Sequence, residues 1–436
     1  MRLIDTLRDP ARWTFTGVPA IASWRVYLIE RQEVDVALRR ALFGGPYSPP
    51  AIRSSACAEV FIQWADGRCT QSILNRTQLL TPSETLPILY SQSYPDPYPE
   101  HVPGPTELPD LRVCVPEIKA AVLEDASVIV PLIQQLAQEL RRLPTEQIRA
   151  NFGATYSRVT FVTSEGADSS HETTRVNYGA TISSRATFSH DLRQLPTPEQ
   201  IAARLKRVRE DYEVLERPRE RVMETPRVFL VPTLSRMFLN YFLLQNLSMQ
   251  NVLNGFSAFT RRQLEDQEQL FHPSLTITDH PLRDDHPTAF RLCARGQVPQ
   301  ARPLIQEGRL LDADISLRAA TQGGLDPTPT SMTENWIVEG TPTELDSELN
   351  SRQLAGIDDA VLLYSVLGLH TSDPVRAAYS LGVPRAMVIE GGRPTGFIRG
   401  TVVGNFFEDL RAPLDLRQDP LSELPILPLQ ARFIPQ

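Results

Sequence analysis

Apolar residues recur along this chain with two periods, which predict strands in some segments and helices in others. Strands are predicted where apolar residues alternate or run together, at 24–30, 57–64, 69–74, 157–163 and 173–183. Turn residues mark two hairpins among them, Asp66-Gly67 in the first and Ser164-Glu165-Gly166 in the second. A short helix is expected over 34–43.

Two longer helices have a clear apolar face. Residues 128–142 place three leucines at a spacing of four, on one stripe. The second helix, 197–217, opens with Thr197 as N-cap, Pro198 in the first turn and Gln200 completing a capping box. Its apolar seam consists of Ile201, Leu205, Val208, Tyr212 and Leu215. This seam either packs within its own domain or forms a dimer contact.

Residues 78–110 show little periodicity and hold many of the 37 prolines. We expect a long Pro-rich loop, either wrapped on the surface as an insertion or serving as a lid or partner-binding segment.

The second half begins with a predicted strand at 227–231 and an apolar helix at 234–249. Short strand-like segments follow, separated by Gly or Pro, at 273–279, 310–319, 334–339, 386–390 and 396–403. Many short strands and few helices favour a barrel-like antiparallel domain. The predicted fold is α+β, with an N-terminal mixed α/β domain over 1–220 and a barrel-like antiparallel β domain with capping helices over 221–436.

Composition narrows the functional class. With 44 Lys and Arg against 52 Asp and Glu, the net charge is −8, so no general attraction to nucleic acid or to an anionic membrane is expected. No apolar run reaches the length of a membrane span, and the first residues lack the apolar segment of a signal peptide. The four cysteines have no metal-binding or secreted-domain spacing. These features predict a cytoplasmic protein.

Motifs for common catalytic chemistry are absent from the sequence. There is no Gly-x-Ser-x-Gly elbow, Walker loop or dinucleotide fingerprint. The only His-Glu pair, His171-Glu172, has no second His after it and is expected on a solvated polar loop. His280 and His286 flank Asp284-Asp285, a pattern more typical of a surface turn than of a metal site.

The most informative stretch is 368–410, which predicts a strand, a loop, a strand, a hairpin and a strand. Its markers are Gly368-Leu369-His370-Thr371-Ser372-Asp373, Tyr379-Ser380-Leu381-Gly382, Glu390-Gly391-Gly392 and Gly400-Thr401-Val402-Val403-Gly404-Asn405. In this order they resemble the C-terminal signature of the TldD/PmbA family, once called modulators of DNA gyrase. The resemblance covers about 225–410 and implies a two-subunit peptidase system.

The resemblance implies a choice between two kinds of subunit. One carries a zinc-binding His-Glu-x-x-x-His helix after the first strand of this half, with a late Cys as third ligand. Here Asn240, Tyr241 and Gln245 fall at those helix positions, no His occurs between His190 and His272, and no Cys follows Cys293. The chain therefore resembles the TldE/PmbA kind, which lacks the zinc motif, so no metal and no catalytic residue are expected in it.

What this resemblance implies is a non-catalytic subunit that pairs with a TldD-type zinc subunit and helps to hold an unfolded or short peptide. The candidate cleft residues are His370, Thr371, Asp373 and Asn405. Zinc is expected in the partner, and this chain is expected to hold no cofactor. Three other readings remain open. The first is a stand-alone peptide-binding or assembly protein, of which a homodimer would be the sign. The others are a hydrolase with an unrecognised site and a gyrase- or DNA-binding role, which the charge disfavours.

Overall fold

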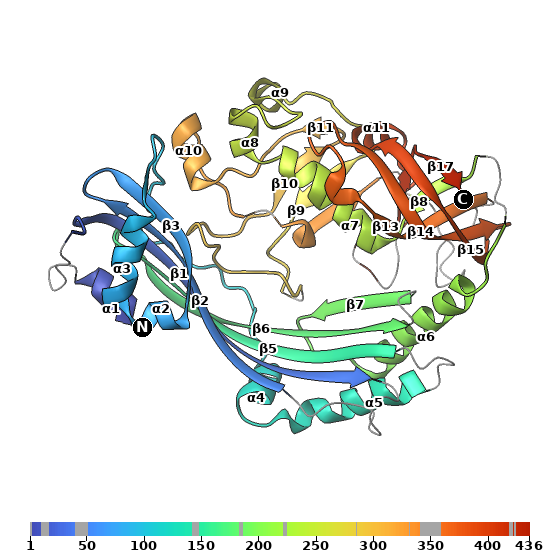
Figure 1. Ribbon diagram of the computed structural model, residues 1–436, viewed down its shortest axis with the longest axis horizontal. Coiled ribbons are helices and arrows are strands. Elements are labelled where there is room, and N and C mark those ends of the chain that lie inside the picture. The colour runs from blue at the N-terminus through green and yellow to red at the C-terminus, as the bar shows by residue number, and fades with distance from the viewer. Residues whose placement is uncertain are drawn as a thin grey trace.

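Three β-sheets of seven, four and six strands form the framework of the protein (Figure 1). The computed structural model describes residues 2–9, 17–39, 51–141, 148–182, 186–220, 225–284, 286–330, 332–340, 359–417, 422 and 424–436. Large antiparallel sheets, one of them a half-barrel, combine with several helices. The chain therefore has the α+β class predicted from its sequence.

The seven-stranded sheet is antiparallel throughout, with the order β4-β3-β2-β1-β5-β6-β7. Its strands are β1 Ile21–Arg39, β2 Ala51–Trp64, β3 Arg68–Asn75, β4 Tyr94–Pro95, β5 Ile148–Thr163, β6 Asp168–Ile182 and β7 Ala186–Leu192. Both predicted hairpins are present. Gly67 and Gly166 each take a positive φ in their turns, a conformation that favours glycine.

Helices cover one face of this sheet. They are α1 Arg2–Arg8, α2 Arg76–Leu80, α3 Pro82–Ser91, α4 Pro116–Leu123, the 3-10 turn η2 Ala126–Ile129, α5 Val130–Arg141 and α6 Pro198–Leu215. Even-numbered β1 residues face them: Val26 packs in the core beneath α1 to α3, and Val34 in the core beneath α4 to α6. Alternation along β1 thus produces one helix-covered face.

No single helix in the described segments combines the length and the apolar character required to cross a membrane. The two helical stretches Pro116–Leu123 and Ala126–Leu140 meet both criteria only when taken together, and they are bent by 113°.

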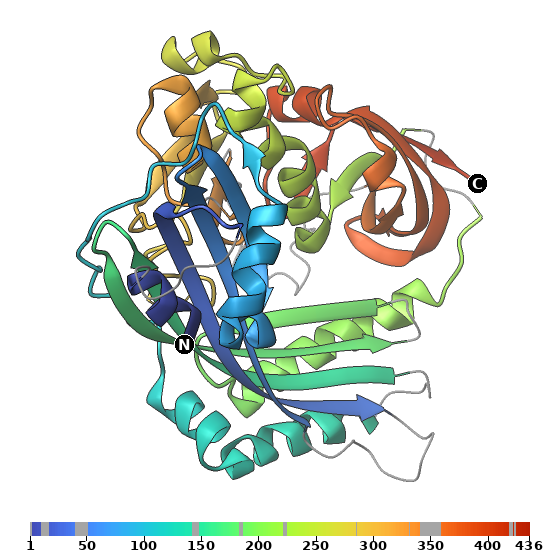
Figure 2. The same ribbon diagram turned by 60° about the vertical axis from the view of Figure 1, so that its left-hand side comes forward.

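The opposite face of the sheet is covered by the C-terminal half and by residues 96–115, which we call the strap (Figures 1 and 2). Odd-numbered β1 positions point this way. Arg25, 2% exposed, pairs with Glu100 of the strap at 2.6 Å and with Glu59 at 3.2 Å, and it also donates to the carbonyl of Ala294. One buried guanidinium thus joins the sheet, the strap and the C-terminal half.

A second arginine fastens the start of the strap to the other half of the chain. Arg318 of the C-terminal half holds the buried Asp96 through both carboxylate oxygens, at 2.9 and 3.1 Å. Thr321 donates to the carbonyl of Pro99 beside it. The pKa of Asp96 is lowered because these hydrogen bonds to Arg318 and to the Tyr98 amide outweigh the opposing effect of burial.

Two predictions for the N-terminal half were wrong. Residues 34–39 continue β1 instead of forming a helix, because Val34 and Val36 alternate with polar residues and fill the core; residues 40–43 lie outside the described part of the chain. The segment 78–110 is not one loop, since it contains α2, α3 and β4. Leu86 and Leu89 of α3 are buried in the core, so an apolar face was present despite the prolines.

Helix α6 was predicted accurately at its start. The Thr197 side chain accepts from the Gln200 amide, and the Gln200 side chain accepts from the Thr197 amide. The seam is buried within this chain: Ile201 to Tyr212 pack in the core of the first sheet, and Leu215 packs against the six-stranded sheet. Because residues of the same chain already cover this seam, packing within the chain is favoured over a dimer contact. The predicted domain boundary just after this helix stays a prediction.

The C-terminal half contains the other two sheets. The four-stranded sheet has the order β11-β10-β9-β12, with β9 Thr276–Asp279, β10 Arg302–Gln306, β11 Arg309–Leu310 and β12 Trp336–Glu339. The six-stranded sheet has the order β16-β8-β13-β14-β15-β17, with β8 Arg227–Leu230, β13 Asp359–Leu367, β14 Ala378–Glu390, β15 Arg393–Asn405, β16 Leu427–Leu429 and β17 Arg432–Pro435. Only β8 and β13 pair in parallel among the described strands.

Short helices complete this half: α7 Pro232–Phe238, the π-helix η3 Leu239–Leu244, α8 Met249–Leu253, α9 Arg261–Glu265, α10 Leu317–Gly323, the 3-10 turns η4 Thr333–Asn335 and η5 Leu369–Thr371, and α11 Phe406–Arg411. The predicted helix 234–249 is thus broken near 247. The strand predicted at 310–319 was wrong beyond Leu310, since α10 begins at Leu317.

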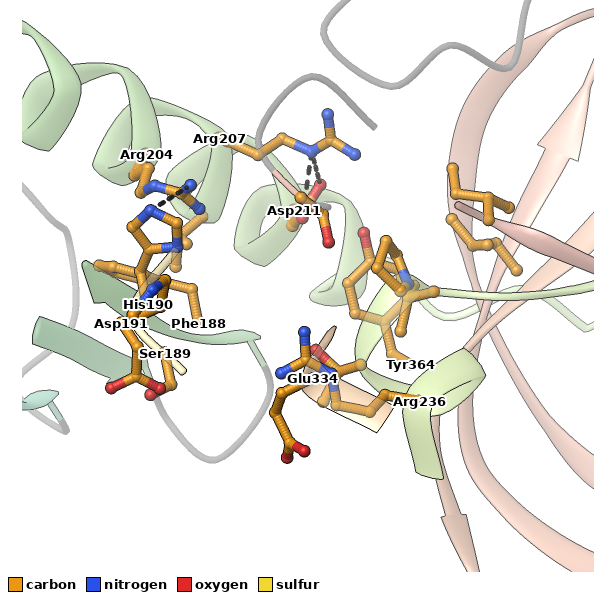
Figure 3. Close-up of a pocket in the computed structure, with 18 of the residues that line it drawn as sticks. Phe188, Ser189, His190, Asp191, Arg204, Arg207, Asp211, Arg236, Glu334 and Tyr364 are labelled. Atoms are coloured by element: carbon orange, nitrogen blue, oxygen red, sulfur yellow. Dashed lines mark hydrogen bonds and ion pairs between the residues drawn. The ribbon is translucent and has the colours of Figure 1, made fainter. Parts of the chain in front are cut away.

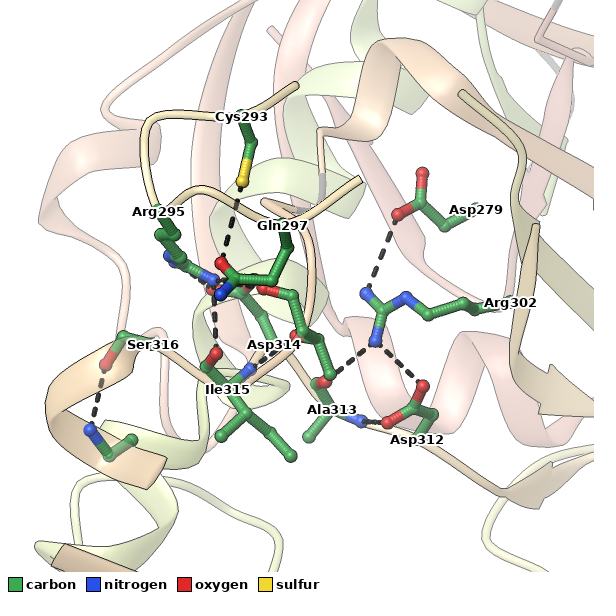
Figure 4. Close-up of polar contacts among 12 residues, drawn as sticks. Asp279, Cys293, Arg295, Gln297, Arg302, Asp312, Ala313, Asp314, Ile315 and Ser316 are labelled. Carbon is green, nitrogen blue, oxygen red and sulfur yellow. Dashed lines mark hydrogen bonds and ion pairs between the residues drawn. The ribbon is translucent and has the colours of Figure 1, made fainter. Parts of the chain in front are cut away.

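Buried ion pairs hold the irregular segment that joins these sheets (Figure 4). Arg302 of β10 lies 3.7 Å from the buried Asp279 of β9 and donates to Asp312 at 2.8 Å. Arg295 binds Asp314 through two hydrogen bonds, at 2.8 and 2.9 Å. These paired charges fix loops that carry little regular structure of their own.

Replacing Arg25 with Met should destabilise the protein by about 3 kcal/mol, because Glu100 and Glu59 would lose a buried counter-charge. The measurement is the urea midpoint of unfolding at neutral pH. The loss should be smaller at about pH 4, because burial raises the pKa of Glu100 and a protonated Glu100 needs no counter-charge.

Arg262→Met is the matched control. Arg262 also pairs with a carboxylate, Asp266, but its side chain is 88% exposed, so its removal should hardly change the midpoint. Equal effects of the two substitutions would show that the Arg25 contact does not hold the halves together.

Candidate functional site

The helix that follows β8 carries the positions at which the sequence suggested a degenerate metal site. Pro232 starts it, in the first turn where a missing N–H is tolerated. Its inner face is aromatic: Phe238 packs edge-on to Tyr379 and Phe406, with ring centres 5.3 and 5.5 Å apart. The helix is therefore clamped inside the half-barrel, and its outer face is set by that packing.

The outer face of this helix is built on a π-helical turn, η3. Asn240 and Gln245 are exposed, whereas Tyr241 is half-buried and donates its hydroxyl to the carbonyl of Ser372 at 3.0 Å. In an α-helix, residues five apart point in different directions; the wider π turn brings them close to one face. The side chains of Asn240 and Gln245 therefore point to nearly the same side of the helix, and Tyr241 is next to Asn240 in the chain.

Asn246, which the sequence analysis did not single out, fixes the end of this helix. It is 1% exposed, and its amide nitrogen donates to the carbonyls of Phe242 and Pro374 at 2.6 and 2.7 Å. Its amide oxygen accepts from the Ala258 backbone. The available signal was a polar pair, Gln245-Asn246, at the end of an apolar run.

The predicted strand, loop, strand, hairpin and strand of 368–410 are all present, as β13, the loop 368–377, β14, the Gly391-Gly392 turn and β15. Gly368 opens the loop with φ +90°. Tyr241 and Asn246 both donate to carbonyls of this loop. The two groups of candidate residues, on the helix and in the loop, are therefore neighbours.

Three of the four candidate cleft residues bind the backbone of their own loop. Thr371 donates to the Gly368 carbonyl at 2.7 Å, and Asp373 accepts from the amides of Val375 and Arg376. Asn405 caps α11 and donates to the Arg376 carbonyl at 2.8 Å. The structure brings Asp373 and Asn405 to the same loop, while His370 and Thr371 lie exposed on η5. Contact with a substrate stays a prediction.

Behind this loop lies a buried acid that the sequence analysis also missed. Asp409 of α11 is 1% exposed, accepts from the Tyr379 hydroxyl at 2.8 Å and from the Gln430 amide at 2.7 Å. Burial raises the pKa of Asp409 to about 7, against the lowering effect of these two hydrogen bonds. Burial likewise raises the pKa of Tyr379.

The pair His171-Glu172 is not on a solvated loop, so that prediction was wrong. It lies within β6, where pairing with β5 buries His171 to 6% exposure. Burial lowers the pKa of His171 to about 4, and nearby Arg291 lowers it further. Glu172 binds Lys119, Tyr156 and Arg158, and these hydrogen bonds lower its pKa to about 2.

Of the two histidines that flank Asp284, His286 makes a side-chain hydrogen bond, whereas the Nδ1 of His280 is buried with no hydrogen-bond partner among the described residues. His286 is buried and its Nδ1 lies 2.8 Å from the Thr288 hydroxyl, while Asp284 accepts from the Arg112 amide; Asp285 lies outside the described residues. Across the described chain, no three His, Cys, Asp or Glu side chains are grouped so that they could hold a metal ion.

Comparison with known proteins bears on the half that holds this helix and loop. Residues 224–422 match the model of the PmbA/TldA metallopeptidase C-terminal domain. This half of the chain therefore carries the C-terminal domain of the TldD/PmbA family. Among relatives in this comparison, an uncharacterized protein of Methanocaldococcus jannaschii is 23% identical over 188 residues. The match spans 41% of this chain and 42% of that protein.

Solved structures share the fold over the whole chain. TldE from Thermococcus kodakarensis superposes with a TM-score of 0.78 at 14% identity, covering 99% of each chain. A candidate modulator of DNA gyrase from Thermotoga maritima gives 0.73 at 15% identity, again over 99% of both chains. A corresponding protein from Bacteroides thetaiotaomicron gives 0.74 at 16%, over 100% of this chain and 98% of that one.

The zinc ion that the TldD/PmbA family implies does not fit the residues present here. Asn240 and Gln245 offer neutral amides, which are poor zinc ligands. The Tyr241 hydroxyl donates to the Ser372 carbonyl, and a phenol hydroxyl does not replace the Glu carboxylate that polarises the attacking water in such sites. No zinc-dependent step can be assigned to these side chains.

The Tyr379–Asp409 pair predicts a specific pH dependence of stability. The folded-state pKa of Asp409, about 7, exceeds its unfolded value of about 3.9. Between these values the folded state retains a proton that the unfolded state has released, so this group lowers stability as pH rises from about 4 to about 7. Asp409→Asn should remove that component, which amounts to at most about 4 kcal/mol.

The check is urea unfolding of both proteins at several pH values from 4 to 8. The free energy of unfolding of the variant relative to the wild type should increase with pH up to about 7 and then level off. A difference that does not change with pH would mean that Asp409 titrates in its ordinary range in the folded protein.

Proposed function

We propose that this chain is the zinc-free, TldE-type subunit of a two-subunit metallopeptidase and that its partner, a TldD-type subunit, supplies the zinc. In this assembly the chain helps to form the cleft that holds an extended peptide, and it carries no catalytic residue. The peptides in question are unfolded or short chains that the complex degrades or trims.

One observation carries the proposal: the π-helical turn at Leu239–Leu244. A His-Glu-x-x-x-His motif, as the family resemblance implies for the other kind of subunit, separates its histidines by five residues, and a π turn brings such residues toward one face. Here the turn is present while Asn240, Tyr241 and Gln245 stand at those positions. The backbone thus has the geometry for the motif without its ligands.

The surrounding contacts support a role in shaping a surface. Tyr241 and Asn246 fasten the helix to the 368–377 loop through the carbonyls of Ser372 and Pro374. That leaves Asn240, Gln245, His370 and Thr371 exposed on adjoining elements. Exposed amides, an imidazole and a hydroxyl are suited to hydrogen bonds with a peptide backbone, which does not require a particular sequence.

The test is reconstitution with the TldD-type subunit of the same organism. Zinc content and cleavage of an unfolded peptide are measured for each chain alone and for the mixture. We expect this chain alone to hold no zinc and to cleave nothing, and the mixture to form a stable complex that cleaves the peptide.

Stoichiometric zinc together with cleavage by this chain alone would contradict the proposal. A chain that binds peptide as a homodimer and does not associate with the TldD-type subunit would instead support a stand-alone peptide-binding protein. A variant with Tyr241→Phe serves as an internal probe: losing the bond to Ser372 should reduce cleavage by the complex, by about tenfold or less, without preventing assembly.

A further inference from the structure

A second site, separate from the η3 helix face, lies where the two halves of the chain meet. A cavity of about 350 Å³ opens between β7 and α6 on one side and the start of α7, with β13, on the other (Figure 3). Its volume is at the small end of ligand-binding pockets. It can therefore hold the end of a peptide but not a folded chain.

The first wall of the cavity is an open strand edge. Phe188, Ser189, His190 and Asp191 all line it, although successive side chains of a strand point to opposite faces. The strand thus presents its backbone edge. Among the described strands β7 pairs only with β6, so its other edge has N–H and C=O groups available to an extended peptide.

The second wall carries the guanidinium of Arg236, whose Nε has no hydrogen-bond partner among the described residues. The side chain of Arg236 extends from α7 into the cavity (Figure 3). Its Nε atom is buried. Glu334 also lines the cavity, yet the described residues include no ion pair between it and Arg236.

The other arginines of the cavity, and Asp191, have partners. Arg207 pairs with Asp211 at 3.3 Å, Asp191 pairs with Arg175 at 2.5 Å, and Arg204 lies 2.9 Å from the His190 ring. Arg236 is therefore the cation best placed to bind an added anion. A guanidinium can bind a carboxylate through two parallel hydrogen bonds.

Part of the lining of the cavity is apolar. Val231, Leu362, Tyr364 and Ile426 line it, and Leu362 and Ile426 are each only 1% exposed. A ligand that matches all three walls has an extended backbone, a carboxylate and an apolar side chain next to that carboxylate. The C-terminal residue of a peptide combines these features.

We propose that this cavity binds the C-terminal carboxylate of an extended peptide that ends in an apolar residue. The inference rests on the proposed function, since it names a substrate feature for the same assembly. The peptide would lie along the free edge of β7, with its carboxylate on Arg236 and its last side chain against Leu362 and Ile426.

The test uses the full chain and a fluorescently labelled hexapeptide that ends in Leu, prepared with a free carboxylate and as the C-terminal amide. Binding is followed by fluorescence anisotropy. For the wild type we expect the amide to bind at least tenfold more weakly than the free acid. Arg236→Gln should lower the affinity for the free-acid peptide by about tenfold, so that the acid and the amide bind equally well. The affinity of Arg236→Lys for the free acid should lie between those of the wild type and Arg236→Gln.

Arg262→Gln, on the exposed helix α9, is the matched control and should bind as the wild type does. Competition with acetate and succinate requires no variant. It distinguishes a site for the carboxylate of a peptide from a site for any small free carboxylate. A peptide site predicts that they displace the peptide only at concentrations at least a hundredfold higher. Displacement at equal concentrations, or equal affinity of acid and amide for the wild type, would overturn the inference.

The outcomes also separate this inference from the proposed function. If the wild-type chain discriminates acid from amide but forms no active complex with the TldD-type subunit, the site stands and the proposed function fails. If the complex is active and neither the complex nor the chain discriminates the two peptides, only the C-terminal site is wrong.

Discussion

The arrangement of the two halves depends on arginine side chains buried between them. Arg25, from the central strand β1, meets Glu100 of the strap, Glu59 of β2 and the carbonyl of Ala294. Because a buried guanidinium has to be neutralised, these partners must arrive together. The strap, the first sheet and the loop near 294 are thereby held at fixed distances. This junction helps to place the two halves between which the cavity around Arg236 lies.

Much of the fold could be predicted from local patterns in the sequence. The capping box at Thr197, the Asp66-Gly67 turn and the strands around Gly391-Gly392 depend on neighbours close in the chain, and the structure has each of them. Prediction failed where tertiary burial decided the outcome. The helix α3 forms although Pro87 lies inside it, because Leu86 and Leu89 are buried against the first sheet.

The candidate sites were less accessible to sequence reasoning. The order of the signature segments indicated the right family. The hydrogen-bond partners of Asp373 and Asn405, however, are loop amides and a loop carbonyl whose positions follow only from the folded loop. Asn246 and Asp409 have partners far away in the chain or in another element. The cavity around Arg236 is assembled from seven separate segments, so no local motif could indicate it.

The position of β8 has a consequence for the order of folding. This short strand, Arg227–Leu230, lies between β13 and β16, which are synthesised much later, at 359–367 and 427–429. The seven-stranded sheet, by contrast, is complete by residue 192. On the ribosome the first sheet can therefore form while β8 still lacks both neighbours, and closing the long loops to them is entropically slow. During that interval the apolar helix after β8 is exposed, which makes the nascent C-terminal half a substrate for chaperones.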